Sequence, residues 1–400
     1  MSPSVALLLS LASVLLLLRL KVHPGPAVFL GSLILSFLVL PARQTPVLML
    51  STVTSLQTLR LIGIIICALS LSKLMELRGL LLKLAHTLET IGPRLAMHVV
   101  PSVIAMVPMP GGALVSAIAL KDLARRLGLA PAEATFINFW FRHIWELAIP
   151  VYPAVIAASV VLSVSLSSIV TTMWPVIPLM AVCGGIASYR ILRNSHAERA
   201  ESLTGSRLVA ELFRASWPVL LLISLVLGGI EAALAFLAAG LLLAVQQRAS
   251  KDEIKQSLKY GFGPRVLFLL YSVMLYKGIV EHSGAAYALF TDMQTIGMPP
   301  AVILVALPAV VGFATGLSMA FVGISFPLLL PFMSVAGDIS GYALFLAYVG
   351  GGVGYMLSPL HLCLTLSSEF FDARLGDVYR LMVPPLLAVL AVALVVYLSF

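Results

Sequence analysis

The sequence predicts an all-α polytopic membrane protein with about ten transmembrane helices and two re-entrant hairpins, arranged as two inverted-topology repeats. Of the 400 residues, 60% are apolar and 10% are charged, whereas about 25% of the residues of a soluble domain are charged. The apolar runs are long and continuous rather than alternating as in a membrane β-barrel. These observations exclude a soluble enzyme, a nucleic-acid-binding protein and a disordered chain.

Ten apolar stretches are candidates for a spanning helix, which needs about 20 mostly apolar residues. They are 4–18, 27–42, 58–75, 132–164, 167–192, 209–227, 230–247, 264–280, 340–371 and 377–400. We expect two of them to be broken, 132–164 at Ile149–Pro153 and 340–371 across Gly350–Pro359. Four glycines between Gly350 and Gly354 make a continuous helix unfavourable there.

Two further apolar stretches, 94–120 and 299–333, contain several prolines and glycines and fit poorly as single spans. Broken backbone at membrane depth is tolerated only where protein or a watery cavity surrounds it, so we predict two re-entrant hairpins. Two amphipathic stretches, 76–93 and 248–260, are expected to lie on the cytoplasmic surface.

The positions of most basic residues indicate how the chain is oriented in the membrane. With the N-terminus outside, 21 of the 25 lysines and arginines fall in inside loops, three (Arg43, Arg60 and Lys277) fall outside, and Arg142 is left within a span. This bias follows the positive-inside rule. We therefore expect a multi-pass protein of the cell (plasma) membrane with both termini outside, and the net charge of +8 does not indicate nucleic acid.

The same order of features occurs twice, in residues 1–192 and 209–400, which are joined by a hydrophilic cytoplasmic linker at 193–208. Each half is expected to cross the membrane five times, an odd number, so the second half is inverted. Inverted repeats with broken helices are typical of secondary transporters. The chain has no GxxxxGK[ST] motif for ATP, and its three cysteines show no metal-binding spacing.

The segment NFWFRHIWELAIPVYP carries the ionisable residues Arg142, His143 and Glu146 within an expected span. Such residues are costly in a membrane and usually mark a site. We expect Arg142 to attract an anionic substrate, and His143 or Glu146 to couple a proton or cation. Alternatively, Arg142 and Glu146 form a structural pair on one helix face. Asn138 either ligates a cation or makes a helix–helix hydrogen bond.

The hairpin tips have their own chemistry. Glycine lets a ligand touch the backbone, helix N-termini favour anions, and unwound carbonyls suit Na⁺; the alternative is that these glycines only permit close packing. Beyond the second break, Ser358 is expected to cap a half-helix whose first turn holds His361, which contacts substrate, shuttles a proton or is structural. The candidates for substrate binding are Arg142, His143, Gly111, Gly112, Ser116, Ser318, Ser358 and His361, and those for ion coupling are Glu146, Asn138, Pro110, Thr315, Gly351 and Thr365.

The strings VPMPGGALVSA, NFWFRHIWE and GYMLSPLHLCL resemble the domain-of-unknown-function 401 family of the ion transporter superfamily. The resemblance implies a scaffold domain, a mobile transport domain that holds both hairpins and both broken helices, and a homodimer. It also implies an anionic solute moved with Na⁺ or H⁺. The Ser-Asn-Thr motifs of the superfamily's dicarboxylate branch are absent, so that branch's specificity is not carried over.

The expected function is ion-coupled transport of a small, anionic solute by alternating access, without enzymatic activity and without a cofactor other than Na⁺ or H⁺ as coupling ion. The expected partners are the solute and the lipid bilayer, with no nucleic acid. Two alternatives are an anion channel and an intramembrane metal-dependent enzyme with His143, Glu146 and His361 as ligands. The His-x-x-Glu spacing is not HExxH, and Arg142 beside a divalent cation is unfavourable.

Overall fold

A computed structural model describes residues 2–80, 92–106, 112–193 and 205–400, and it confirms the predicted all-α polytopic membrane fold. The helices of the first half are α1 (Pro3–Arg19), α2 (Pro24–Val39), α3 (Gln44–Thr54), α4 (Leu56–Leu77), α6 (Pro93–Ala105), α7 (Gly112–Arg126), α8 (Pro131–Arg142), α9 (Pro153–Val161), α10 (Leu166–Met173) and α11 (Val176–Leu192).

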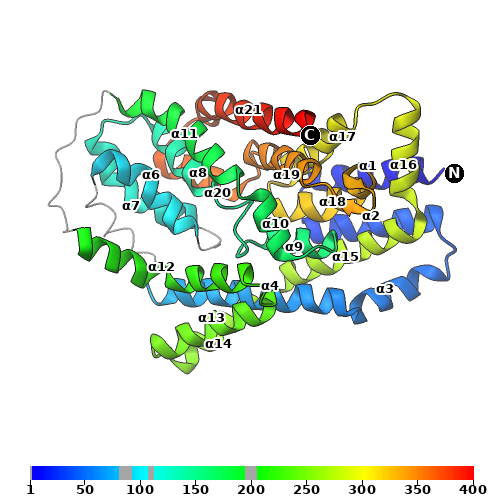
Figure 1. The fold of residues 1–400 in the computed structure, drawn as a ribbon, viewed down its shortest axis with the longest axis horizontal. Helices are drawn as coiled ribbons and strands as arrows, with labels where there is room; N and C mark the ends of the chain where they lie inside the picture. Colours follow the sequence, from blue (N-terminus) through cyan, green and yellow to red (C-terminus); the bar gives the residue numbers. More distant parts are fainter. Residues whose placement is uncertain (1, 81–91, 107–111, 194–204) are drawn as a thin grey trace.

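The elements of the second half are α12 (Gly205–Leu227), α13 (Ala232–Gln246), α14 (Lys251–Gly261), α15 (Pro264–Ser283), α16 (Ala285–Thr295), α17 (Pro300–Thr315), α18 (Ser318–Met333), the paired strands β1 (Ser334–Val335) and β2 (Asp338–Ile339), α19 (Gly341–Met356), α20 (Leu362–Phe371) and α21 (Leu375–Ser399). Most of the long helices run along the length of the molecule, whereas α16 stands across them at one end (Figure 1).

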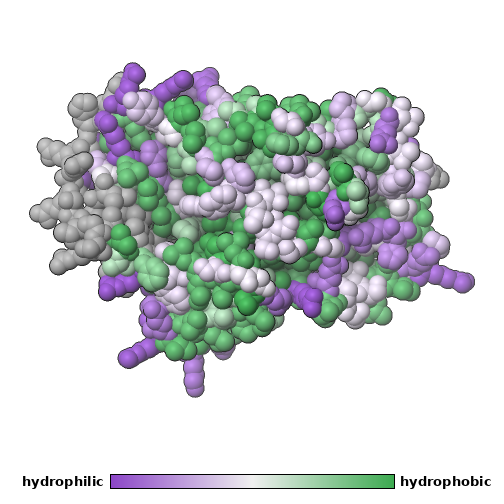
Figure 2. All heavy atoms as spheres, viewed as in Figure 1, coloured by the Kyte–Doolittle hydropathy of each residue, from purple (hydrophilic) through white to green (hydrophobic). Residues whose placement is uncertain are grey.

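Four stretches in the described ranges are long and apolar enough to cross a membrane, judged by length and composition. They are Leu56–Leu77, Leu166–Leu192, Lys251–Ser283 and Leu375–Ser399, and seven shorter helices are also apolar. Apolar side chains cover much of the visible surface, and hydrophilic ones gather mainly toward its edges (Figure 2). An apolar surface of this kind is typical of a protein that lies in a lipid bilayer. The predicted count of ten crossings stays a prediction.

Local sequence signals explain many helix starts. Proline occupies the first turn of several helices, among them α6, α8, α9 and α17, where its missing N–H costs nothing. Serine side chains cap others, for example Ser55 before α4 and Ser340 before α19.

Both predicted hairpins are helix pairs, α6–α7 and α17–α18. The tip of the first, residues 107–111, lies outside the described residues. The tip of the second is Gly316 and Leu317, and Gly316 has a φ of +65°. Glycine adopts this left-handed conformation without strain, so the chain reverses there abruptly. That either pair is re-entrant remains a prediction.

Both predicted broken helices are broken, but each break begins elsewhere than expected. The first covers residues 143–152 rather than Ile149–Pro153, because α8 already ends at Arg142. The second covers residues 357–361, so the expectation that Gly350–Gly354 interrupt the helix is wrong. That glycine stretch is helical, and because its glycines lack side chains α19 can approach α17 closely. This packing stabilises the helix there.

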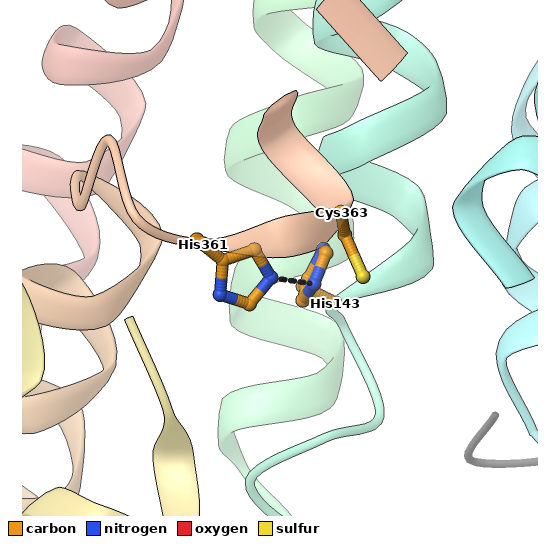
Figure 3. Close-up of side chains that lie close together, drawn as sticks. All are labelled: His143, His361 and Cys363. Atoms are coloured by element: carbon orange, nitrogen blue, oxygen red, sulfur yellow. Dashed lines mark hydrogen bonds between the residues drawn. The ribbon is translucent and has the colours of Figure 1, made fainter. Parts of the chain in front are cut away.

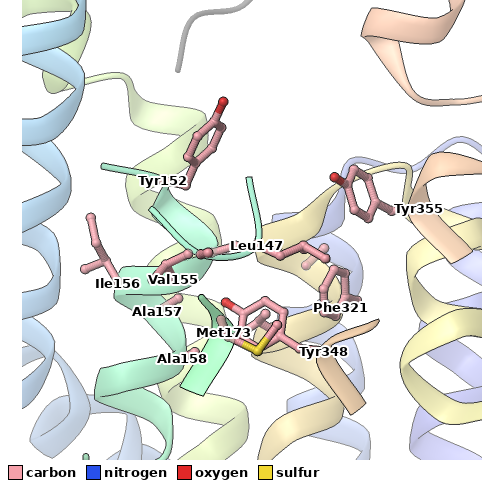
Figure 4. Close-up of a cluster of buried hydrophobic side chains, with 14 of the residues drawn as sticks. Leu147, Tyr152, Val155, Ile156, Ala157, Ala158, Met173, Phe321, Tyr348 and Tyr355 are labelled. Atoms are coloured by element: carbon pink, nitrogen blue, oxygen red, sulfur yellow. The ribbon is translucent and has the colours of Figure 1, made fainter. Parts of the chain in front are cut away.

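The close approach of α19 to α17 is visible at single atoms. A Cβ added to Gly354 would lie 2.0 Å from the carbonyl oxygen of Ala309, and one added to Gly350 would lie 2.9 Å from Val305 Cα. Small residues bring membrane helices together in this way, so the glycines stabilise packing rather than a break. Beside this contact, Leu147, Phe321, Tyr348 and Tyr355 belong to a buried cluster (Figure 4).

The order of elements recurs along the chain. α17 begins 207 residues after α6, and both α20 and α21 begin 209 residues after their counterparts α9 and α10.

The predicted surface helix at 248–260 corresponds to α14. Residues 81–91 of the other predicted surface stretch and residues 194–204 of the linker lie outside the described ranges. Two short helices, α3 and α16, were not expected from the sequence. The inverted relation of the halves stays a prediction.

Candidate functional site

A cavity of about 330 Å³ lies where the two breaks meet the tip of the second hairpin. Three apolar side chains from α4 and α15, Leu69, Val266 and Leu269, line it on the side facing those helices. The remaining lining residues come from the breaks, the helix ends beside them and the hairpin; they are Arg142, His143, Glu146, Tyr152, Pro153, Gly316, Leu317, Ser318, Met319, His361, Leu362 and Cys363.

The end of α8 and the first break together supply the charged residues of the cavity. Arg142 is the last residue of α8 and His143 its C-cap, and they are 4% and 1% exposed. His143 Nδ1 lies 2.5 Å from the carbonyl oxygen of Phe139, one of the carbonyls that a helix end leaves without an intrahelical partner. Glu146 lies beyond the helix rather than on a shared helix face with Arg142, as one alternative required.

The carboxylate of Glu146 connects the first break to the second hairpin. Its Oε1 accepts a hydrogen bond of 2.6 Å from the Ser318 hydroxyl, and its Oε2 lies 3.6 Å from His143 Nε2. A hydrogen bond to an ionised group is among the stronger ones in proteins. Two residues predicted for different roles, Glu146 and Ser318, therefore lie in contact although 172 positions separate them.

The second break contributes His361. It is the N-cap residue of α20, rather than a residue of the first turn as expected, and its side chain does not cap the helix. Its Nδ1 lies 2.9 Å from the carbonyl oxygen of Gly316, and its Nε2 lies 3.0 Å from His143 Nε2. Figure 3 shows the two imidazoles facing each other through these atoms. A side chain at Gly316 would collide with the backbone of His361, 2.7 Å away.

Cys363 is a residue of the site that the sequence reasoning missed. The donor atoms of His143, His361 and Cys363 all lie within 4.8 Å of one another (Figure 3). The signal available was its position two residues after His361 in the string HLC, near the start of α20. Such a trio can ligate a soft metal ion, but Arg142 lines the same cavity and would repel a divalent cation.

The other predicted residues of the second half do not line the cavity. The Thr315 hydroxyl bonds the carbonyl of Val311 at the hairpin tip, and the Thr365 hydroxyl bonds that of His361. The Ser358 hydroxyl accepts from the N–H of Leu360 within the break instead of capping α20. Gly351 lies within α19, where a Cβ would meet the Phe321 ring at 2.3 Å.

The two predicted residues of the first hairpin that the structure describes, Gly112 and Ser116, do not line this cavity. Gly112 begins α7, and the Ser116 hydroxyl bonds its carbonyl within the helix. Asn138 donates to the carbonyl of Ala113 and to the Ser367 hydroxyl, so it joins α8 to α7 and α20. Pro110 and Gly111 lie outside the described residues.

Broken helices and paired helical hairpins around a cavity with charged residues in its lining define a polytopic helical membrane protein. The YdaH transporter of Alcanivorax borkumensis, whose crystal structure is described as revealing an unusual topology, has a TM-score of 0.65 and 15% identity to this chain. The likeness covers 90% of this chain and 89% of that one, and at this identity it shows the fold.

The whole sequence, residues 1–400, matches the family described as "Protein of unknown function (DUF401)", and the chain belongs to that family. This confirms the resemblance inferred from the sequence motifs. Among curated proteins, no match was found.

Proposed function

We propose that this protein is an ion-coupled secondary transporter that binds a small anionic solute in the cavity between the two breaks and moves it by alternating access. The single observation that carries this proposal is the cavity itself, which places the buried Arg142 beside the tip of a hairpin and the start of a half-helix. Intramembrane ionisable residues with such surroundings mark solute and ion pathways.

Backbone groups add to the attraction for an anion. Two helices begin at the cavity, α18 at Ser318 and α20 at Leu362, and both residues line it. The N–H groups of a helix N-terminus are unpaired and carry partial positive charge, so both starts favour a carboxylate, phosphate or sulfonate group. A guanidinium adds paired, charge-assisted hydrogen bonds to the same kind of group.

The walls suggest which parts move. Elements of the breaks and of the second hairpin supply the polar lining, whereas α4 and α15 supply apolar side chains. In our proposal the hairpins and broken helices form a transport unit that slides against a scaffold containing α4 and α15, in a homodimer with both termini outside the cell. An apolar scaffold face lets such a unit pass without breaking hydrogen bonds.

A thermal-shift panel of acetate, succinate, phosphate, sulfate and methanesulfonate, applied to the purified protein, tests the anion site. We expect at least one anion to raise the melting temperature of the wild type and of the control Lys73→Gln, whose lysine forms a surface pair with Glu76. Arg142→Gln should weaken binding about 10- to 100-fold, since a charged hydrogen bond contributes roughly 1.5–3 kcal/mol.

Two results would contradict this proposal. If Arg142→Gln keeps the full shift in melting temperature, Arg142 does not bind the anion. If none of the anions shifts the melting temperature at pH 6 or at pH 8, the cavity is not an anion site. Uptake into proteoliposomes then distinguishes mechanisms, because a coupled transporter accumulates the anion against its gradient while a channel does not.

A further inference from the structure

The contact between His143 and His361 joins two imidazoles at atoms that are both acceptors when both rings are neutral. Each ring already uses its other nitrogen: His143 Nδ1 faces the carbonyl of Phe139, and His361 Nδ1 faces the carbonyl of Gly316. A carbonyl oxygen only accepts, so each Nδ1 must carry a proton. The two Nε2 atoms are then unprotonated, and their lone pairs face each other across 3.0 Å.

Counting protons shows what the arrangement lacks. Three contacts, two to carbonyls and one between the rings, require three N–H groups. Two neutral imidazoles carry one N–H each, so any neutral pair of tautomers leaves one contact with two acceptors and no donor. One additional proton satisfies all three contacts, and 3.0 Å is an ordinary length for N–H···N.

The surroundings balance the charge that this proton brings. Burial opposes a charged imidazole, but the Glu146 carboxylate lies 3.6 Å from His143 Nε2. The other titratable groups that face the pair are Arg142 and Tyr152 from the first break, Tyr355 from α19 and Cys363 from α20. The hairpin contributes the Gly316 carbonyl and the Ser318 hydroxyl, and α4 and α15 contribute apolar side chains to the cavity.

We propose that His143 and His361 together bind one exchangeable proton between their Nε2 atoms, and that this proton is the coupling ion of the transporter. The second half of the proposal rests on the anion-binding function proposed above. Na⁺ does not suit the place, because sodium prefers oxygen ligands and the converging atoms are imidazole nitrogens.

Coupling follows from the charges. Without the proton, Arg142 and Glu146 give the cavity lining no net charge; with it, the lining carries one positive charge. An anion therefore binds more tightly to the protonated state, and by reciprocity the anion strengthens proton binding by the same factor. The proton also bridges both breaks and, through His361 and Gly316, the hairpin tip. Proton and anion are thus expected to travel in the same direction.

Nitrogen-15 NMR of histidine-labelled protein in nanodiscs tests the shared proton directly. At pH 6 we expect a pair of rings with three N–H protons, and a scalar coupling between the two Nε2 atoms across the hydrogen bond. His361→Gln should abolish that coupling and return His143 to a neutral ring. His282 is the matched control, since its Nδ1 also contacts a carbonyl four residues earlier, 2.8 Å away, but its side chain is exposed.

Two NMR outcomes would overturn the proposal. Both Nε2 atoms unprotonated down to pH 5 would show a neutral pair, and a signal that changes only when Zn²⁺ is added would show a metal site instead. His143→Gln gives an independent check, because a proton held by one ring alone would survive it in His361.

The pH dependence of anion binding tests the coupling separately, with the same five anions as probes. One proton per anion predicts affinity that falls up to tenfold per pH unit above the titration of the pair, and His361→Gln should remove that slope. Anion binding that is independent of pH would overturn the coupling and leave the anion site intact. A shared proton in NMR without binding of any of the five anions would instead contradict the proposed function.

Discussion

The two broken helices share one architecture and contribute different chemistry. The break after α8 spans ten residues, 143–152, and together with the last residue of α8 it brings Arg142, His143 and Glu146 to the cavity. The break after α19 spans five residues, 357–361, and brings one imidazole and the start of α20. The charges therefore come from one half of the chain, and the second half supplies backbone dipoles and a histidine that completes a pair.

The two broken helices also pack against their neighbours by opposite means. α8 places the large side chain of Trp140 against Gly184 of α11, where an added Cβ would lie 2.0 Å from the indole nitrogen. α19 instead carries the glycines itself and brings its backbone against the backbone of α17. Corresponding helices of the two halves therefore pack by different contacts. The following variants test this difference.

Gly354→Ala should have the largest effect. Its Cβ would meet the Ala309 carbonyl oxygen at 2.0 Å, so two helix backbones must separate. Overpacking of this kind costs about 3 kcal/mol, and we expect a clear loss of melting temperature in detergent. The control is Gly185→Ala, where nothing lies within 4 Å and alanine favours the helix. Equal stability of the two variants would contradict the close packing of α19 on α17.

Gly184→Ala should cost less, about 2 kcal/mol, because its neighbour is a side chain rather than a backbone. The indole of Trp140 must still leave its hydrogen bond of 2.9 Å to the Met180 carbonyl in order to move away. The comparison of melting temperatures should therefore rank Gly354→Ala below Gly184→Ala, and both below Gly185→Ala. The reverse order for the first two would show that the contacts of α8 are the stricter ones.

Ser318→Ala should weaken the connection between the first break and the second hairpin. It removes the donor to Glu146 and leaves a partly buried carboxylate oxygen without that partner, at a cost of about 1.5 kcal/mol. We expect roughly tenfold weaker anion binding in the thermal-shift panel, a smaller loss than in Arg142→Gln. Ser334→Ala serves as the control, because Ser334 is exposed just after α18 and its hydroxyl bonds the Leu330 carbonyl in the last turn of that helix. Unchanged anion binding in Ser318→Ala would show that the tip of the second hairpin does not contribute to the anion site.

Much of the fold was predictable because proline and glycine act locally. Pro300 begins α17 and Pro359 lies within the second break, so the start of the second hairpin and the position of that break could be located approximately from the sequence. Glycine is less informative, since its cost in a helix is only about 1 kcal/mol and close packing can repay it. The four glycines in Gly350–Gly354 predicted a break because each one disfavours a helix. The segment is helical because the glycines pack against α17, which the local sequence does not show.

The site was predictable residue by residue, but not as an arrangement. Charge within a span singled out Arg142, His143 and Glu146, and the Gly-Pro interruption drew attention to His361. Nothing local indicates that His143 meets His361, 218 positions away, because that contact depends on how two breaks from different halves pack. Cys363 escaped notice since a lone cysteine in an apolar run is most often an inert core residue.

Cys363→Ala should have the smallest effect, and it decides where the proton between the histidines comes from. If the proton is taken from solution, the thiol only hydrogen-bonds His143 and holds no part of the shared proton, and anion binding should change by less than about twofold, roughly 0.4 kcal/mol. If Cys363 instead gives its own proton to the pair, or ligates a metal with it, the alanine variant loses the three-proton signal of the rings. Cys183→Ala is the control, because that cysteine lies in α11, away from the cavity lining. A large effect specific to Cys363 would therefore show that the second half, through α20, contributes a charged group to the cavity as the first half does.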